Sequence, residues 1–130
     1  MSSRRINDEK GQTMVEFALV VPLLLVVLFA VIQFGGVYND YIALTDATRV
    51  GARKAAVSRQ AANPAGAAEA AVRSSASDLR QADLDVRVST PAWEHGRDVT
   101  VAATYPYEID LLGFVVASGE LESETTERVE

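Results

Sequence analysis

The sequence contains no cysteine and a single histidine, His95, and both facts narrow the chemistry that it supports. Without cysteine there is no disulfide framework, thiolate metal site or cysteine nucleophile. For the same reason, disulfide usage gives no information on the cellular compartment. His95 lies in a predicted turn beside Trp93 and Glu94, so no histidine cluster with metal-ligand spacing forms. There is no GxSxG elbow or phosphate-binding loop, and no carboxylate pair stands apart from ordinary surface charge. We therefore expect a protein that is not an enzyme and that needs no metal or cofactor.

Basic residues are fewer than acidic residues, 12 against 18, which gives a formal net charge of -6. Three basic and three acidic residues lie before residue 38, so the rest of the chain carries the whole of this net charge. An acidic surface lacks the cations that displace counterions from nucleic acid or that bind anionic lipid. We expect no nucleic-acid partner.

Long apolar runs are absent except for one, residues 14–37 (MVEFALVVPLLLVVLFAVIQFGGV). Glu16 is its only charged residue, and Gln33 is its only other strongly polar one. A helix of this length is about 36 Å long, which exceeds the roughly 30 Å hydrocarbon core of a bilayer. A domain this small cannot cover a helix that is apolar on every side. The run therefore predicts a single transmembrane helix over residues 12–37.

A cleaved secretory signal is the main alternative, since Arg4 and Arg5 form a basic region before the apolar run. The run is longer than the roughly 7–15 apolar residues of a signal, and its exit lacks a small-x-small cleavage site. We therefore expect the helix to be retained. The basic residues of the N-terminal segment favour a cytoplasmic N-terminus, whereas those just beyond the span (Arg49, Arg53 and Lys54) favour the opposite orientation.

Pro22 lies inside the apolar run and removes the backbone hydrogen bond to the carbonyl of Ala18. Membrane helices tolerate such prolines when neighbouring groups satisfy the carbonyl that is left. Both a local kink, used in helix packing, and a harmless membrane proline are compatible with this position.

Glu16 needs an explanation, because an ionised carboxylate near hydrocarbon costs roughly a few kcal/mol. An interfacial glutamate that reaches the headgroups is one interpretation. The flanking residues support another: Gly11 ends a charged segment (MSSRRINDEKG), and Glu16 follows five residues later at the start of the apolar run. This arrangement resembles the type IV prepilin signature. The resemblance implies a leader over residues 1–11, a cut between Gly11 and Gln12 by a prepilin peptidase, and a Glu16 carboxylate that neutralises the amine of an adjacent subunit.

A longer pattern is similar to the TadE-like family of minor pilins or pseudopilins of tight-adherence secretion systems. It comprises GQTMVEFALVVPLLL, the exit QFG at residues 33–35 and ATRVGAR at residues 47–53. Two residues depart from the pattern: Phe17 follows the glutamate where major pilins carry tyrosine, and Gln12 rather than an aromatic residue would become the new N-terminus. The first departure suggests a minor subunit.

The resemblance implies a single-pass inner-membrane protein with a cytoplasmic N-terminus and an extracytoplasmic C-terminal domain, or a subunit incorporated in a surface pilus. Its implied partners are other pilin or pseudopilin subunits, the prepilin peptidase and the pilus assembly platform. The alternative function is an uncleaved, single-span membrane anchor whose outer domain recruits an extracytoplasmic partner. Under that alternative, Glu16→Gln should change little.

Residues 38–60 are predicted to continue the span as a stalk helix, because they contain no proline and only one glycine. Small residues recur four apart on one stripe of this helix: Ala43, Ala47, Gly51 and Ala55. Small residues at that spacing let another backbone approach closely, although an alanine-rich composition would produce the same stripe. We expect partner pilins to pack on it, so Gly51→Leu should impair co-assembly and leave the outer hairpin folded.

Residues 61–130 are expected to form a small extracytoplasmic domain. Residues 63–66 (NPAG) break the helix, and a second helix is predicted over residues 67–82. Apolar and polar residues alternate over 84–89 and 99–107, around a turn at 94–97, which predicts a β-hairpin with one buried face. The apolar stretch 111–117 is expected to pack under the sheet or cross its end. The acidic end, residues 120–130, forms either a third strand or a disordered tail. The predicted fold class is α+β, with a long N-terminal helix, a second helix and a small antiparallel sheet.

Overall fold

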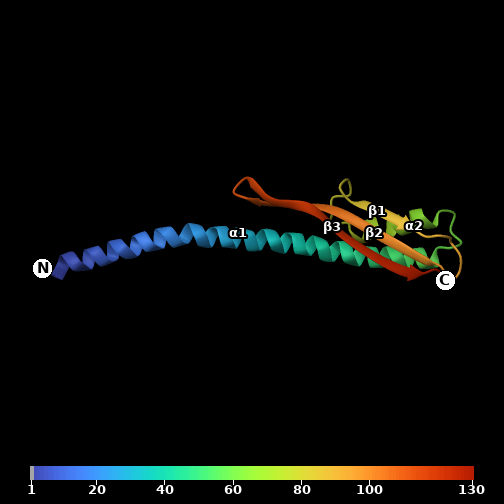
Figure 1. Cartoon of the computed structure of the whole chain (residues 1–130), viewed down its shortest axis with the longest axis horizontal. Helices are drawn as coiled ribbons and strands as arrows, with labels where there is room; N and C mark the ends of the chain where they lie inside the picture. The colour runs from blue at the N-terminus through green and yellow to red at the C-terminus, as the bar shows by residue number, and fades with distance from the viewer. Residues whose placement is uncertain (1) are drawn as a thin grey trace.

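The computed structural model describes the chain from Ser2 to Glu130, and its side chains from Asp8 onward. The elements follow in the order α1 (Ser2–Val57), α2 (Pro64–Ser75), β1 (Asp85–Ser89), β2 (Asp98–Leu111) and β3 (Phe114–Arg128). This confirms the expected α+β class. α1 runs along nearly the whole molecule, and the other elements gather beside its C-terminal half (Figure 1). Met1 and the side chains of Arg4 and Arg5, on which the orientation argument depends, lie outside the described residues.

α1 is one continuous helix of 56 residues. Pro22 is the only proline inside it, so every other residue of the helix keeps the backbone amide that a helix interior uses. The helix continues through Pro22, and the ribbon curves gently in its blue N-terminal part, which includes that residue (Figure 1). α1 ends at Val57, where the amide of Ser58 donates a hydrogen bond to the carbonyl of Ala55 at 3.2 Å. The helix predicted over residues 12–37 thus continues without a break through residues 38–57.

α2 starts and ends earlier than the helix predicted over residues 67–82. Asn63 is its N-cap, because the Asn63 Oδ1 accepts a hydrogen bond from the Gly66 amide at 3.0 Å and Pro64 occupies the first turn. Asparagine at the cap with proline behind it is a helix start, so these residues begin α2 instead of preceding it. The helix ends where the amide of Ala76 bonds to the carbonyl of Val72 at 2.9 Å.

The three strands form one antiparallel sheet in the order β1-β2-β3. The predicted alternation is confirmed in β2, where every second residue from Val99 to Tyr105 is buried. β3 pairs with β2 along its length, so the acidic end of the chain is a strand and not a disordered tail. Glu120, Glu122 and Glu124 lie on the exposed face, while Ser123 is buried on the other face.

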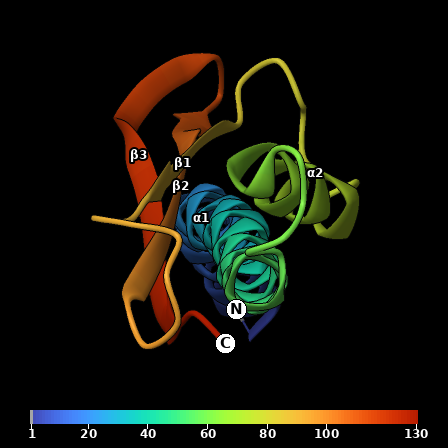
Figure 2. The same ribbon diagram turned by 90° about the vertical axis from the view of Figure 1, so that its right-hand side faces the viewer.

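The core lies between the sheet, α2 and the C-terminal half of α1, which Figure 2 shows in end view. Small and β-branched side chains dominate it, and they are Ala47, Ala52, Ala55, Ala68, Val72, Val99, Val101, Ala103 and Val129. Leu44 is fully buried among them. The segment expected to be a stalk is therefore the central helix of the domain. The chain end closes onto it, because the amide of Glu130 donates a hydrogen bond to the carbonyl of Ala56 at 2.9 Å.

The expectation that residues 111–117 pack under the sheet is wrong. β2 continues to Leu111, and the β2–β3 hairpin extends past β1 and α2 alongside α1, toward the N-terminal part of the molecule (Figure 1). The apolar stretch forms the free end of this hairpin. Leu112 and Phe114 are each 75% exposed there.

Candidate functional site

The apolar half of α1 projects away from the folded domain (Figure 1). α1 is long and apolar enough to cross a membrane, and its most apolar window is entirely unburied in the described structure. Its large side chains are exposed, including Phe17, Leu24, Phe29 and Phe34. A helix that is apolar on every side needs lipid or other helices around it. This arrangement fits the predicted single span.

Gln12 and Glu16 lie one turn apart at the start of the apolar run, and both are exposed. Gln12 Nε2 donates a hydrogen bond to Glu16 Oε1 at 3.1 Å. None of the ion pairs among the described side chains includes Glu16. Within that part of the chain, the exposed Glu16 carboxylate therefore accepts a hydrogen bond from a neutral amide and forms no ion pair.

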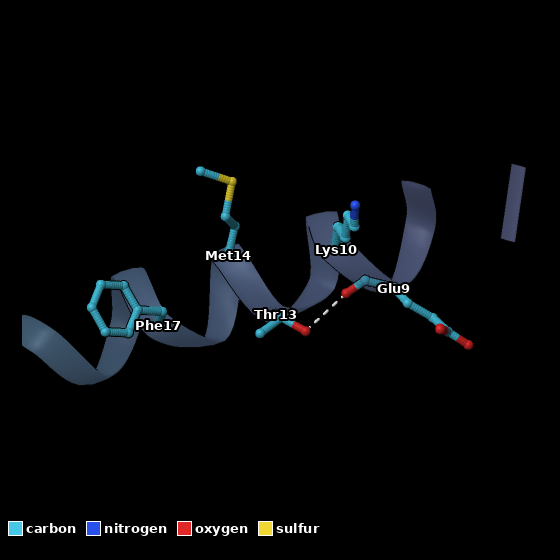
Figure 3. Close-up of a pocket in the computed structure, with 5 residues that line it drawn as sticks. All are labelled: Glu9, Lys10, Thr13, Met14 and Phe17. Carbon is cyan, nitrogen blue, oxygen red and sulfur yellow. Dashed lines mark hydrogen bonds between the residues drawn. The ribbon is translucent and has the colours of Figure 1, made fainter. Parts of the chain in front are cut away.

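Gly11 lies on the same helix, and a side chain at this position would meet no atom within 4 Å. The neighbouring turns form a shallow hollow on the helix surface, lined by Glu9, Lys10, Thr13, Met14 and Phe17 (Figure 3). Thr13 Oγ1 donates a hydrogen bond to the Glu9 carbonyl at 2.9 Å, which fixes the threonine against its own helix. The bond between Gly11 and Gln12 therefore lies on an open helix surface, far from the folded domain.

Gln33 joins the span to the sheet, because its Nε2 donates a hydrogen bond to the Asp110 carbonyl at 2.9 Å. Beside this contact is a cleft between α1 and β2, lined in part by Gln33, Asp40, Arg80, Tyr105 and Tyr107. A side-chain hydrogen bond to Tyr105 raises the pKa of the Arg80 guanidinium, and the nearby Asp83 carboxylate adds to the effect. The cleft thus places a permanent cation close to the point where α1 leaves its apolar run.

The family model of TadE-like proteins matches residues 11–53. We call residues 11–53 the TadE-like segment. The family resemblance inferred from the residues is thereby confirmed, and the match with the apolar helix fits a pilus-related membrane protein. The TadE-like segment begins at Gly11, contains the exposed apolar run and Gln33, and ends within α1. No curated protein and no solved structure matches the chain.

The small-residue stripe runs from the TadE-like segment to the last turn of α1, and its members are Ala43, Ala47, Gly51 and Ala55. The last three are buried, and Ala43 packs partly buried against the same core. A Cβ on Gly51 would clash with Val72 Cγ2 of α2 and would lie 3.3 Å from Val101 Cγ1 of β2. Small residues at this spacing do let another backbone approach, but it is the chain's own α2 that does so. This corrects both the expected partner surface and the expectation that the hairpin folds independently of it.

Thr48 is a site residue that the sequence pattern did not reveal. It is fully buried in the TadE-like segment, and its Oγ1 donates to the Thr45 carbonyl at 2.9 Å. The same oxygen lies 3.2 Å from both Ser123 Oγ and Thr125 Oγ1 of β3. This hydroxyl cluster ties α1 to the last strand. A threonine in a sequence does not show by itself whether it is buried, so only the partners 75 residues or more away identify the role of Thr48.

Proposed function

We propose that this chain is a minor pilin or pseudopilin subunit of a tight-adherence pilus or a related secretion machine, assembled through α1. Its role is one of assembly and not of catalysis. The observation that carries the proposal is the order Gly11, Gln12 and Glu16 on an exposed helix that turns apolar at once, in a TadE-like segment. In this topology the N-terminus is cytoplasmic, the folded domain is outside, and the subunit starts in the inner membrane.

Cleavage after Gly11 is the first step of the proposed function. A glycine in a helix interior costs about 1 kcal/mol relative to alanine, so Gly11 weakens the helix at the turn where a prepilin peptidase must reach the backbone. The exposure of this turn supports access from outside the chain. The cut removes the charged leader and gives Gln12 a free α-ammonium group.

Pairing between subunits is the second step. The new ammonium and the Glu16 carboxylate are both costly near hydrocarbon, and bringing them together across two subunits offsets that cost. In the intact chain, Glu16 accepts its bond from the Gln12 side chain. Cleavage creates a cation at Gln12, and this cation would pair with Glu16 of the next subunit that the assembly platform brings to it.

Co-purification with partner pilins tests this proposal. Glu16→Gln keeps the size and the hydrogen bonding of the side chain and removes its charge. We expect the variant to enter the membrane fraction as the wild type does and to retain at least tenfold less partner pilin. Glu122→Gln, which changes the same group on the exposed face of β3, is the matched control. If Glu16→Gln retains partners as well as this control does, the uncleaved anchored module is the better account.

A further inference from the structure

The end of the β2–β3 hairpin, residues 111–116, carries apolar side chains on both of its faces. In the part of the sheet nearer the core, apolar and polar residues alternate along β2, so that apolar residues face the core and polar residues face outward. Beyond Asp110 this alternation stops: Leu112, Phe114, Val115 and Val116 follow one another and are all more than half exposed. We call residues 111–116 the hairpin tip. No residue of the described chain covers it, and a sheet end in water has no reason to be apolar on both faces.

The hairpin tip lies at the depth of the apolar run of α1. β2 starts beside the C-terminal end of α1 and descends to Asp110, whose carbonyl accepts the hydrogen bond from Gln33. Gln33 is about 26 Å along the helix axis from Glu16 at roughly 1.5 Å per residue. A hydrocarbon core of about 30 Å that begins near Glu16 therefore ends close to Gln33, a little beyond it. The turn after Asp110 lies about 7 Å deeper still, at roughly 3.3 Å per strand residue.

The turn itself presents an apolar side chain at a conformational cost. Leu112 and Gly113 have φ of 54° and 86°, the two positive values of a two-residue hairpin turn that favours Asn-Gly. A leucine in the left-handed region is disfavoured, so a bulky apolar residue stands where a small polar one would be more stable in water. Asp110 Oδ1 accepts a hydrogen bond from the Gly113 amide at 2.9 Å, which satisfies a backbone group of the turn.

A register shift between Ile109 and Asp110 turns the tip relative to the rest of the sheet. Ile109 pairs with Ala117, whereas Asp110 pairs with Val115, so Val116 is an extra residue on β3. Bulges bend a strand and re-aim its side chains. Here the bulge falls at the level of Gln33, where the alternation of the sheet also ends.

We propose that the hairpin tip is a second membrane contact of this protein, which dips into the lipid leaflet at which α1 leaves the bilayer. Its occupant is the headgroup and acyl boundary of the same bilayer that α1 spans. Backbone groups must be paired to enter hydrocarbon, and in the tip the pairing of Leu111 with Phe114 and the bond from the Gly113 amide to Asp110 Oδ1 supply such pairs. α1 and the tip then fix the tilt of the domain on the membrane. This proposal requires α1 to span a bilayer, and it does not rest on the assembly role.

The chemistry of the tip makes the contact hydrophobic rather than electrostatic. The charged groups nearest to it, Glu108 and Asp110, are acidic, so anionic lipid gives no attraction. Zwitterionic phosphatidylcholine is therefore a sufficient lipid, and the contact should not weaken in high salt. A second copy of the chain covering the same side chains is the competing occupant.

Single-cysteine labelling tests the proposal directly, because the chain contains no native cysteine. Full-length Leu112→Cys and Val116→Cys would carry an environment-sensitive fluorophore in phosphatidylcholine nanodiscs loaded with one chain each. Thr126→Cys, exposed on the same strand, is the matched control. Trp93 fluorescence confirms that each variant folds, since this side chain packs against the core.

We expect the fluorophores at both tip positions to emit at shorter wavelength than the control and to be quenched by lipids that carry a nitroxide near the headgroup. They should also be at least threefold less accessible than the control to an aqueous quencher. All three results should hold at low and at high salt. Tip probes that are as accessible as the Thr126 probe would overturn the proposal. Protection that arises only when several chains share a disc would also overturn it, because the contact would then be between copies of the chain.

Discussion

Replacing Gly51 by alanine sets two effects of opposite sign against each other. Gly→Ala in a helix interior stabilises by about 1 kcal/mol when the new methyl group is free of contacts. At Gly51, however, that methyl group would clash with Val72 Cγ2 and lie 3.3 Å from Val101 Cγ1 and 3.4 Å from the Ala68 carbonyl oxygen. Val72 is fully buried and β-branched, so it cannot rotate away easily. Overpacking of this kind costs about 1–3 kcal/mol, and we expect a net loss of about 1 kcal/mol.

Thermal unfolding in mild detergent measures this difference, with Trp93 fluorescence reporting on the domain. A net loss of about 1 kcal/mol lowers Tm by roughly 4–8 °C in a domain of this size. Gly36→Ala is the matched control, because a Cβ there meets no atom within 4 Å and the residue lies in the apolar run. Because the added methyl group of the control is free of contacts, the control should not lower Tm of the domain. A Gly51→Ala variant with a raised Tm would refute the close packing of α1 against α2.

Two further substitutions test other contacts by chemical denaturation in the same detergent. Thr48→Val removes the hydroxyl that contacts Ser123 and Thr125 while keeping the shape of the side chain. We expect a loss of about 1–3 kcal/mol in the free energy of unfolding, because the remaining buried hydroxyls have fewer partners. An unchanged denaturation midpoint would contradict the hydroxyl cluster. Asn63→Ala removes the cap of α2 and should cost about 1 kcal/mol. A loss below the error of the measurement would show that the cap is satisfied by other groups.

Local patterns predicted most of the secondary structure. The apolar run predicted a helix long enough to span a membrane, and alternation predicted β1 and most of β2, because periodicity is a property of neighbouring residues. The last strand was one of two alternatives for the acidic end. The start of α2 was within reach as well: Asn63 followed by Pro64 is a cap signal, and treating it as a break placed the helix three residues late. These features need no knowledge of distant partners.

Contacts between distant segments were beyond a local pattern. The stripe at Ala47 and Gly51 predicts that a backbone comes close, and it does not say which chain supplies that backbone. The apolar stretch after Asp110 predicts burial, but its depth beside α1 depends on the length of β2 and on the bond from Gln33, 77 residues away in the sequence. Both errors came from assigning an apolar or small face to the wrong neighbour.

The residues of the candidate site also fall into those that a local pattern reveals and those that depend on distant contacts. Gly11, Gln12 and Glu16 were found from their order along the chain, since the motif is local and the family match covers it. The Gln12 to Glu16 hydrogen bond follows from an i, i+4 spacing on a helix. Thr48 could not have been chosen, because its partners lie on β3.

Intact-mass spectrometry of the membrane-extracted chain tests most directly whether α1 works as a pilin assembly segment. The chain would be produced in cells with an active prepilin peptidase and, as a control, in cells with an inactive one. The account predicts that the active cells yield a chain that has lost residues 1–11 and begins at Gln12, and that the inactive cells yield the intact chain. An intact leader in cells whose peptidase processes another prepilin would contradict it.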